Sequence, residues 1–219
     1  MRIITVDHDL ADVSTNGFAT GLTGPGPFTT FTVSTPTDGI AHKISLTAPA
    51  ANDLSAITMT ITGTDADGIA LVEARLGPGS STTVNTTGYF KTLTSITASV
   101  SLGALVMDVG WSAGSVSRTI CLNRYGDAVA GIAVFVTGTV AYNVEQTFSP
   151  FNSANEVISG VGSPKLWIRN ITVFGGATTV AISAAGGPQQ SANGVRLVTD
   201  SYSSGAELQM FVTQTSASS

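Results

Sequence analysis

The chain has 219 residues, of which 11% are charged and 42% hydrophobic, and its net charge is −5. The nine basic residues lie singly between Arg2 and Arg196, so the chain lacks the clustered Lys and Arg side chains that bind nucleic-acid phosphates. Apolar runs end after about five residues, whereas a membrane-spanning helix needs roughly 20. We therefore expect neither a nucleic acid nor a membrane as a direct partner.

Short strands are the predicted elements, because apolar and polar residues alternate with a period of two between Gly, Asn, Asp or Pro turns. The clearest is 57–62, where Ile57, Met59 and Ile61 share one face and threonines occupy the other. Asp67-Gly68 then predicts a hairpin turn, since both positions tolerate positive φ. In the amino-terminal half we predict an edge strand at 2–6 and further strands at 29–34, 40–47, 57–62, 69–76, 89–100 and 104–111.

The carboxyl-terminal half repeats the pattern, with strands predicted at 118–123, 131–136, 140–148, 165–174, 178–184, 194–200 and 207–215. So many short strands with tight turns predict an all-β fold, an antiparallel β-sandwich or jelly roll. The expected organisation is a main sandwich region over 1–148, including an amino-terminal arm over about 1–28, and a carboxyl-terminal β region over 149–219. That second region is either a separate lobe or the completion of the same sandwich.

The stretch "GWSAG" at 110–114 matches the Gly-x-Ser-x-Gly pattern of a nucleophile elbow at Ser112. An elbow needs a helix after the serine, but "SVSRTICLN" reads as a strand. Both histidines, His8 and His42, precede Ser112, which is not the order of that fold; a chymotrypsin-like order with His42, an aspartate and then Ser112 remains formally open. We expect a loop serine between strands and no catalytic residue.

No metal, cofactor or reactive thiol is expected. "TDADG" at 64–68 resembles part of a calcium loop, but Ala74 occupies the position of the bidentate glutamate, so a hairpin turn explains it. In "DHD" at 7–9, Asp7 and Asp9 would share one strand face with His8 opposite, so three ligands cannot converge. Cys121, the single cysteine, is predicted to be a buried and inert thiol.

Two long segments are similar to structural proteins of tailed-bacteriophage virions. Residues 57–99 contain "TITGTDADG", a "GP" turn and "FKTLTS" in the order found in that family, and "NRYGDAVAGIAVFVTGTVAYNVEQTF" at 123–148 resembles its next segment. The similarity covers about residues 50–150 and, more loosely, 190–215. The stretch 165–190 departs from the family pattern.

The resemblance implies a virion structural protein, most simply a capsid decoration (cement) protein that binds the major capsid protein or other virion proteins. The alternatives are a neck or tail adaptor, a fibre-base protein, and a carbohydrate-binding β-sandwich module with Trp111 or Trp167 as platform.

The amino terminus has no apolar stretch before Asp7, so we expect no secretory signal and assembly in the host cytoplasm. We also expect a homo-oligomer, a dimer or trimer. Its predicted interface anchors are the loop-borne aromatics Phe18, Phe28, Phe148 and Phe151.

Overall fold

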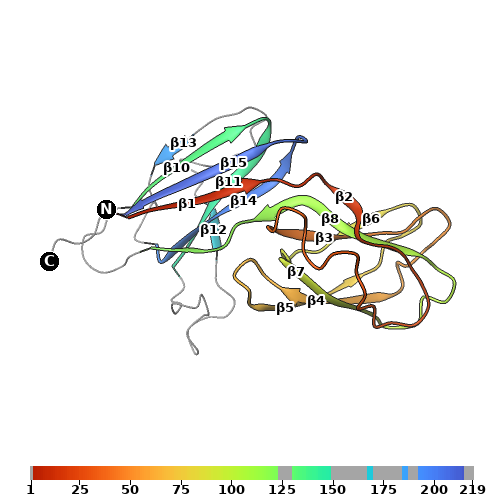
Figure 1. The fold of residues 1–219 in the computed structure, drawn as a ribbon. Coiled ribbons are helices and arrows are strands. Elements are labelled where there is room, and N and C mark those ends of the chain that lie inside the picture. The colour runs from red at the N-terminus through yellow and green to blue at the C-terminus, as the bar shows by residue number, and fades with distance from the viewer. Residues whose placement is uncertain (1, 123–129, 149–166, 170–183, 187–191, 215–219) are drawn as a thin grey trace. The chain divides into compact units, whose positions relative to one another are not determined.

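The computed structural model describes residues 2–122, 130–148, 167–169, 184–186 and 192–214, and the statements below concern these residues alone. They form fifteen strands and no helix, so the predicted all-β fold is confirmed, and the strand pairs are antiparallel (Figure 1). No helix in this part of the chain could span a membrane. The chain divides into two compact units: residues 1–10 with 116–219, called the first unit, and residues 11–115, called the second unit.

The second unit contains two sheets. Its strands are β2 (Ser14–Leu22), β3 (Ala41–Thr47), β4 (Thr58–Thr64), β5 (Ala70–Leu76), β6 (Thr83–Asn85), β7 (Thr92–Ala98) and β8, which runs over Met107–Val116 and ends at the division. One sheet has the order β8-β3-β6 with β2 paired to β8, and the other has the order β5-β4-β7.

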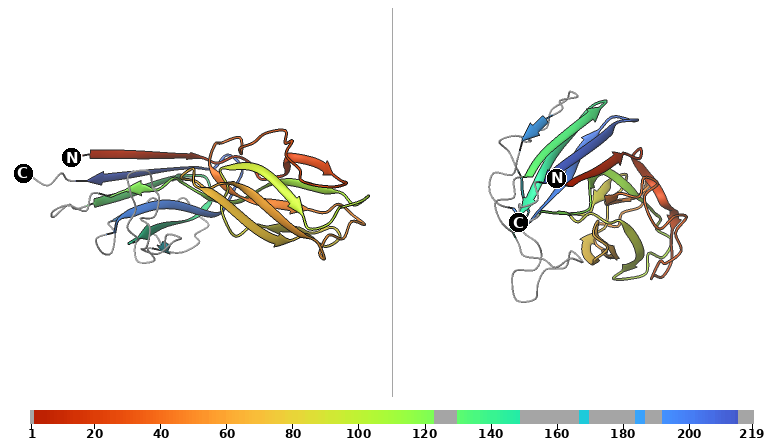
Figure 2. Two further views of the ribbon diagram at one scale, coloured as in Figure 1. Left: turned by 90° about the horizontal axis from the view of Figure 1, so that it is seen from below. Right: turned by 60° about the vertical axis from the view of Figure 1, so that its left-hand side comes forward.

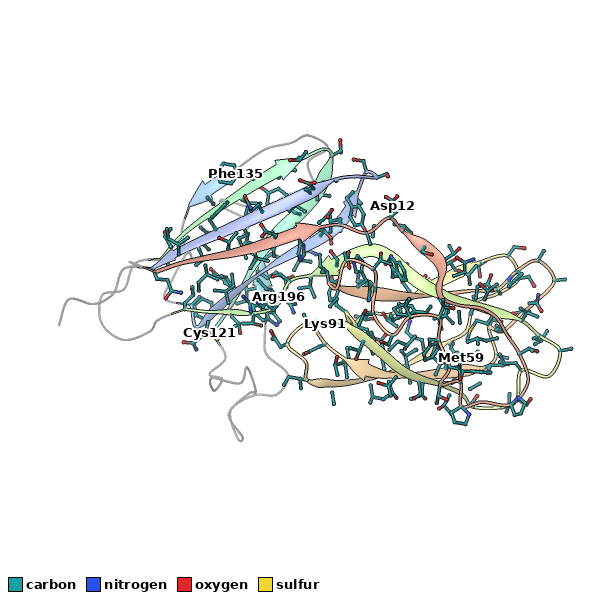
Figure 3. All side chains as sticks on the ribbon, in the orientation of Figure 1. Asp12, Met59, Lys91, Cys121, Phe135 and Arg196 are labelled. Carbon is teal, nitrogen blue, oxygen red and sulfur yellow. The ribbon has the colours of Figure 1, made fainter. Side chains whose placement is uncertain are left out.

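The two sheets of this unit enclose one apolar core. Met59 and Ile61 from β4 and Ile96 from β7 are fully buried and belong to the same cluster as Ile44 of β3 and Met107 of β8. Figure 3 labels Met59 in this interior. The predicted alternation at 57–62 is confirmed, because Ile57, Met59 and Ile61 are buried and the intervening threonines are not. The predicted turn is also confirmed: Asp65 Oδ1 accepts the N–H groups of Asp67 and Ile69, and Gly68 has a φ of 84°.

The first unit is built from both ends of the chain. Its strands are β1 (Arg2–Asp9), β9 (Ile120–Cys121), β10 (Ala130–Thr137), β11 (Val140–Thr147), β12 (Trp167–Arg169), β13 (Ala184–Gly186), β14 (Gly194–Tyr202) and β15 (Glu207–Gln214). One sheet has the order β1-β15-β10-β13, and in the other β11 lies between β12 and β14. The first strand thus pairs with the last, which runs beside it in every view (Figures 1 and 2).

Several predictions of local structure are corrected. The predicted edge strand at 2–6 is confirmed as part of β1, which pairs with β15 at the edge of its sheet. Because residues 14–22 are also a strand, paired with β8, residues 2–9 and 14–22 do not form an amino-terminal arm. Residues 29–34 are not a strand. This segment forms isolated main-chain hydrogen bonds, such as the one from Thr32 N–H to Phe18 O, in place of a ladder. The predicted boundary at 148/149 differs from the observed divisions, and β11 and β14 on its two sides pair within one unit.

Parts of three predictions lie outside the described residues. Only 167–169 of the predicted strand at 165–174 and only Ala184 of that at 178–184 are described, and the connection over 149–164 is not.

Candidate functional site

The outer face of the β1-β15-β10 sheet combines aromatic rings with carboxylates. In antiparallel pairs, directly opposite residues share a face, so the register defines rows of side chains across the three strands. One row is Asp7, Gln209 and Phe135, and the next is Thr5, Phe211 and Ala133. Asp9, Glu207 and Thr137 form the row at one end, and Ile3, Thr213 and Gly131 the row at the other. We call these twelve residues the aromatic face.

The inner side of the same three strands is apolar and buried. Val6, Met210 and Val134 form one inward row, and Val212 and Ile132 belong to the next. This packing fixes the register, since a shift by one residue would exchange the inner and outer sets. The aromatic face is therefore presented by strands that the core of the first unit holds in place.

Two phenylalanines form the apolar centre of the aromatic face. Phe135 is 53% exposed and its ring meets that of Phe211 edge-to-face, with centroids 5.6 Å apart and an interplanar angle of 88°. Ile3, which is also exposed, lies on the same face. Figure 3 labels Phe135 on β10. Phe211 is half-buried, so Phe135 provides most of the exposed ring surface, and covering it by a partner would remove apolar area from water.

Carboxylates form the rim at one end of this face. Asp7, Asp9 and Glu207 are exposed there, and Gln209 Nε2 donates to Asp7 Oδ1 at 2.6 Å. No Lys or Arg belongs to the rows of the aromatic face. A pocket of about 310 Å³ opens at this end, lined by Asp7, His8, Asp9, Phe135, Thr137, Glu207, Leu208 and Gln209. The prediction that Asp7 and Asp9 face away from His8 is confirmed, since His8 is buried. Among the described residues, no cluster of three or more His, Cys, Asp or Glu residues could hold a metal ion.

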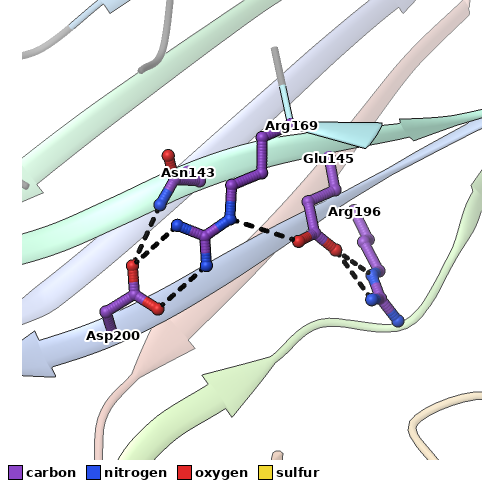
Figure 4. A network of polar contacts seen from close by, with 5 residues as sticks. All are labelled: Asn143, Glu145, Arg169, Arg196 and Asp200. Atoms are coloured by element: carbon purple, nitrogen blue, oxygen red, sulfur yellow. Dashed lines mark hydrogen bonds and ion pairs between the residues drawn. The ribbon is translucent and has the colours of Figure 1, made fainter. Parts of the chain in front are cut away.

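A second group of charges lies in the first unit, on β11, β12 and β14 (Figure 4). Arg196 donates from Nε and Nη2 to Glu145 Oε2 at 2.9 and 2.7 Å, and Arg169 bonds both carboxylate oxygens of Asp200 at 3.2 and 3.4 Å. Arg169 Nε also lies 3.7 Å from Glu145 Oε1. Two cations thus neutralise two carboxylates, and the arrangement ties three strands together.

The structure gives Ser112 and His42 structural positions. Ser112 lies within β8, so no elbow forms, and its main-chain oxygen is 2.9 Å from His42 Nδ1. His42 Nε2 lies 2.7 Å from Asp38 Oδ2, and the histidine is fully buried. Both ring nitrogens of His42 thus lie within hydrogen-bond distance of oxygens other than the Ser112 hydroxyl, so the geometry does not pair that hydroxyl with His42 as a base.

Two of the four predicted interface anchors are buried in the second unit. Phe18 is fully buried and meets Trp111 edge-to-face at 5.2 Å, and Phe28 is buried in the same core. A side chain without exposed area cannot contact another subunit, so the interface role of Phe18 is wrong, and burial removes Phe28 as an anchor as well. Phe148 is partly exposed after β11, and Phe151 lies outside the described residues.

The surroundings of the two tryptophans and of the cysteine also differ from expectation. Trp111 is buried and its Nε1–H donates to Asp12 O at 3.0 Å, while Trp167 has the Arg196 guanidinium over its ring at 4.1 Å, so neither is a free platform for a sugar. Cys121 is exposed, which corrects the predicted buried thiol: the alternation in β9 places its neighbour Ile120 in the core instead.

Comparison with known proteins adds no relative. No family model, no curated protein and no solved structure matches the chain.

Proposed function

We propose that the chain is a structural protein of a tailed-phage virion, a decoration protein that attaches to the head through the aromatic face. The observation that carries the attachment is the exposed Phe135 ring, packed edge-to-face on the half-buried Phe211, with its carboxylate rim. Aromatic anchors surrounded by polar residues are the usual centre of a protein interface. The virion assignment itself rests on the resemblance of residues 57–99 and 123–148 to phage structural proteins.

The face specifies the chemistry of its partner. An apolar patch should cover the two rings, and Lys or Arg side chains should meet Asp7, Asp9 and Glu207, because the face carries acidic side chains without a basic one. Charges at the rim mainly affect the association rate and its dependence on salt. The capsid or other virion protein that binds here is therefore expected to present a basic rim around an apolar patch.

Phe135→Ala is expected to weaken binding to purified particles about 30-fold, since loss of a central aromatic anchor costs about 2 kcal/mol or more. The measurement is co-sedimentation of the purified variant with particles that lack the protein. The control is Ile168→Ala, which also truncates an exposed apolar side chain of the first unit, on β12. Equal binding of both variants and the unmodified chain would show that the aromatic face is not the attachment site.

The virion role is tested separately by locating the chain in intact particles by electron microscopy. Density on the head surface would support a decoration protein, and density at the neck or tail would replace it by an adaptor or fibre-base role. Absence of the chain from purified particles would overturn the virion proposal as a whole.

The pocket beside Phe135 favours a second candidate, carbohydrate binding. A half-exposed ring next to three carboxylates and an amide offers an apolar platform with hydrogen-bond acceptors for hydroxyl groups. Glycan-array binding that Phe135→Ala abolishes, together with absence from particles, would favour this candidate over the decoration protein.

A further inference from the structure

Strand β5 is an edge of its sheet with an open row of main-chain groups. Within the fully described second unit it pairs only with β4, in the order β5-β4-β7. The bonds Gly77 N–H to Ile57 O and Asp65 N–H to Ile69 O continue the β4–β5 register at both ends. Hydrogen-bonded pairs alternate in an antiparallel ladder, so the odd-numbered residues of β5 bond β4. Ala70, Val72, Ala74 and Leu76 therefore direct their N–H and C=O groups to the open edge.

The side chains of the same four residues make this edge apolar. Val72 and Leu76, at 61% and 62%, are the two most exposed large hydrophobic residues in the described part of the chain. Their face continues across the threonines of β4 to Ser95 and Thr97 of β7 and carries no charged residue. A long apolar edge strand is a template for pairing with another strand unless the protein protects it.

We infer that the occupant of this edge is a second copy of the chain, with β5 pairing antiparallel to β5 about a two-fold axis at Ala74. Val72 then lies opposite Leu76 of the partner subunit, and Leu76 opposite the partner's Val72. Three hydrogen-bonded pairs exchange about six main-chain bonds. The two three-stranded sheets become one six-stranded sheet with an uncharged outer face. This inference concerns the chain itself and goes beyond the proposed virion role.

Charge complementarity selects this register. When the two-fold axis passes through Ala74, Glu73 lies opposite the partner's Arg75, and Arg75 lies opposite the partner's Glu73. These are the closely spaced pairs, in which side chains interact most. A register centred on Glu73 would place two carboxylates directly opposite each other, which is destabilising. One centred on Val72 would leave Leu76 opposite Gly68 of the partner subunit and lose the Val72–Leu76 contact.

Neighbouring groups contact the two charged side chains of β5. The Glu73 carboxylate accepts the N–H groups of Thr87 and Gly88, each at 2.7 Å, and the Arg75 guanidinium lies 4.0 Å from Glu73 and donates to the Thr87 hydroxyl at 3.3 Å. Inward-pointing charges often protect an edge from pairing. Here they are of opposite sign at positions that a two-fold axis brings together, so they favour one specific pairing.

Cysteine crosslinking tests the register. The variants are made in a Cys121→Ser background, which removes the exposed native thiol. Ala74→Cys should then form disulfide-linked dimers at least about ten times faster than Ala70→Cys. The reason is that only the residue on the two-fold axis lies opposite itself, within the roughly 4.5–5.5 Å Cα separation that a disulfide spans. Fastest crosslinking of Val72→Cys, or no preference among the three positions, would overturn the inference.

The uncrosslinked chain is tested by sedimentation equilibrium. One strand edge is a small interface, so we expect a dimer with a Kd in the micromolar range, roughly 1–100 µM. Arg75→Glu should weaken it at least about tenfold, since each Glu73 would then face a carboxylate of the partner. Leu76→Lys should weaken it similarly, whereas Val100→Lys, at a 59% exposed valine of the same unit outside β5, should not. The proposal would be contradicted if the chain stays monomeric at 200 µM, roughly twice the upper limit of that range. It would also be contradicted if Leu76→Lys and Val100→Lys affect dimerisation equally.

Discussion

Replacement of Asp38 by Ala is expected to lower the free energy of unfolding of the second unit by about 3 kcal/mol, because it leaves buried polar groups, including His42 Nε2, without their hydrogen-bond partner. The Asp38 and His42 side chains are 3% and 0% exposed. Asp38 also accepts the N–H groups of Ala11 at 2.8 Å and Ile40 at 2.9 Å. The variant therefore loses the contact with His42 and leaves two main-chain donors without their acceptor.

The same carboxylate makes stability depend on pH. Desolvation by burial, the largest single influence, raises the pKa of Asp38, but the hydrogen bond and charge of His42 and the N–H groups of Ala11 and Ile40 together outweigh it and lower the pKa below 3.8. A lowered folded-state pKa means that the stabilisation is fully present above the unfolded-state pKa and is lost as the pH falls through the folded-state pKa. The difference between the unmodified chain and Asp38→Ala should therefore shrink as the pH falls below about pH 4.

Urea denaturation at pH 7 and between pH 4 and pH 2.5 measures both effects. Asp53→Ala is the matched control: hydrogen bonds from the side chain and the N–H of Ser55 also lower the pKa of Asp53, but this residue is exposed. Its effect should be much smaller. If the two variants unfold at the same urea concentration at pH 7, the Asp38–His42 pair does not stabilise the unit as described.

The alternation of apolar and polar residues predicted which side chains of a strand face the core better than it predicted which strands pair. It placed Ile57, Met59 and Ile61 inward correctly, because that pattern is local. It could not show that β1 pairs with β15, since the two strands lie at opposite ends of the chain and share no sequence signal. The observed division into units depends on the same pairing, because the first strand belongs to one unit with residues 116–219.

Strand β2 was missed because its sequence, "STNGFATGL", has no alternation. Its pairing with β8 is irregular, with register shifts between Ser14 and Leu22, and Phe18 anchors it through Trp111. The aromatic rings of loops were expected at interfaces, yet Phe18 lies in a strand and in the core.

The sequence predicts which strand face carries each phenylalanine of the candidate site, but not that the two rings meet. Alternation in "GIAVFV" at 131–136 places Phe135 on the face opposite Ile132 and Val134, and the pattern at 207–214 does the same for Phe211. What joins the two rings is the β10–β15 register, which pairs Phe135 with Gln209 and Ala133 with Phe211. Such diagonal neighbours depend on a pairing that no single strand specifies.

Gly110→Ala is expected to destabilise the second unit by about 3 kcal/mol, because "GWSAG" is a close-packing site between β2 and β8. A Cβ added at Gly110 would lie well inside contact distance of the main-chain oxygen of Ser14 and the carbonyl carbon of Thr15. These are backbone atoms that cannot rotate away, so β2 would have to move off β8, and such overpacking costs about 1–3 kcal/mol or more.

Gly114→Ala, in the same strand and the same motif, is the control for this substitution. Its nearest neighbour would be Lys43 Cδ at 3.1 Å, part of a flexible side chain that can shift, so the change should stay below about 1 kcal/mol. Thermal or urea unfolding of both variants measures the difference. Equal stability of the two would mean that β2 does not pack on β8 at Gly110. A large difference would mean that close packing alone accounts for the first glycine of the motif. A nucleophile elbow requires a turn, whereas Gly110, Ser112 and Gly114 all lie within one extended strand.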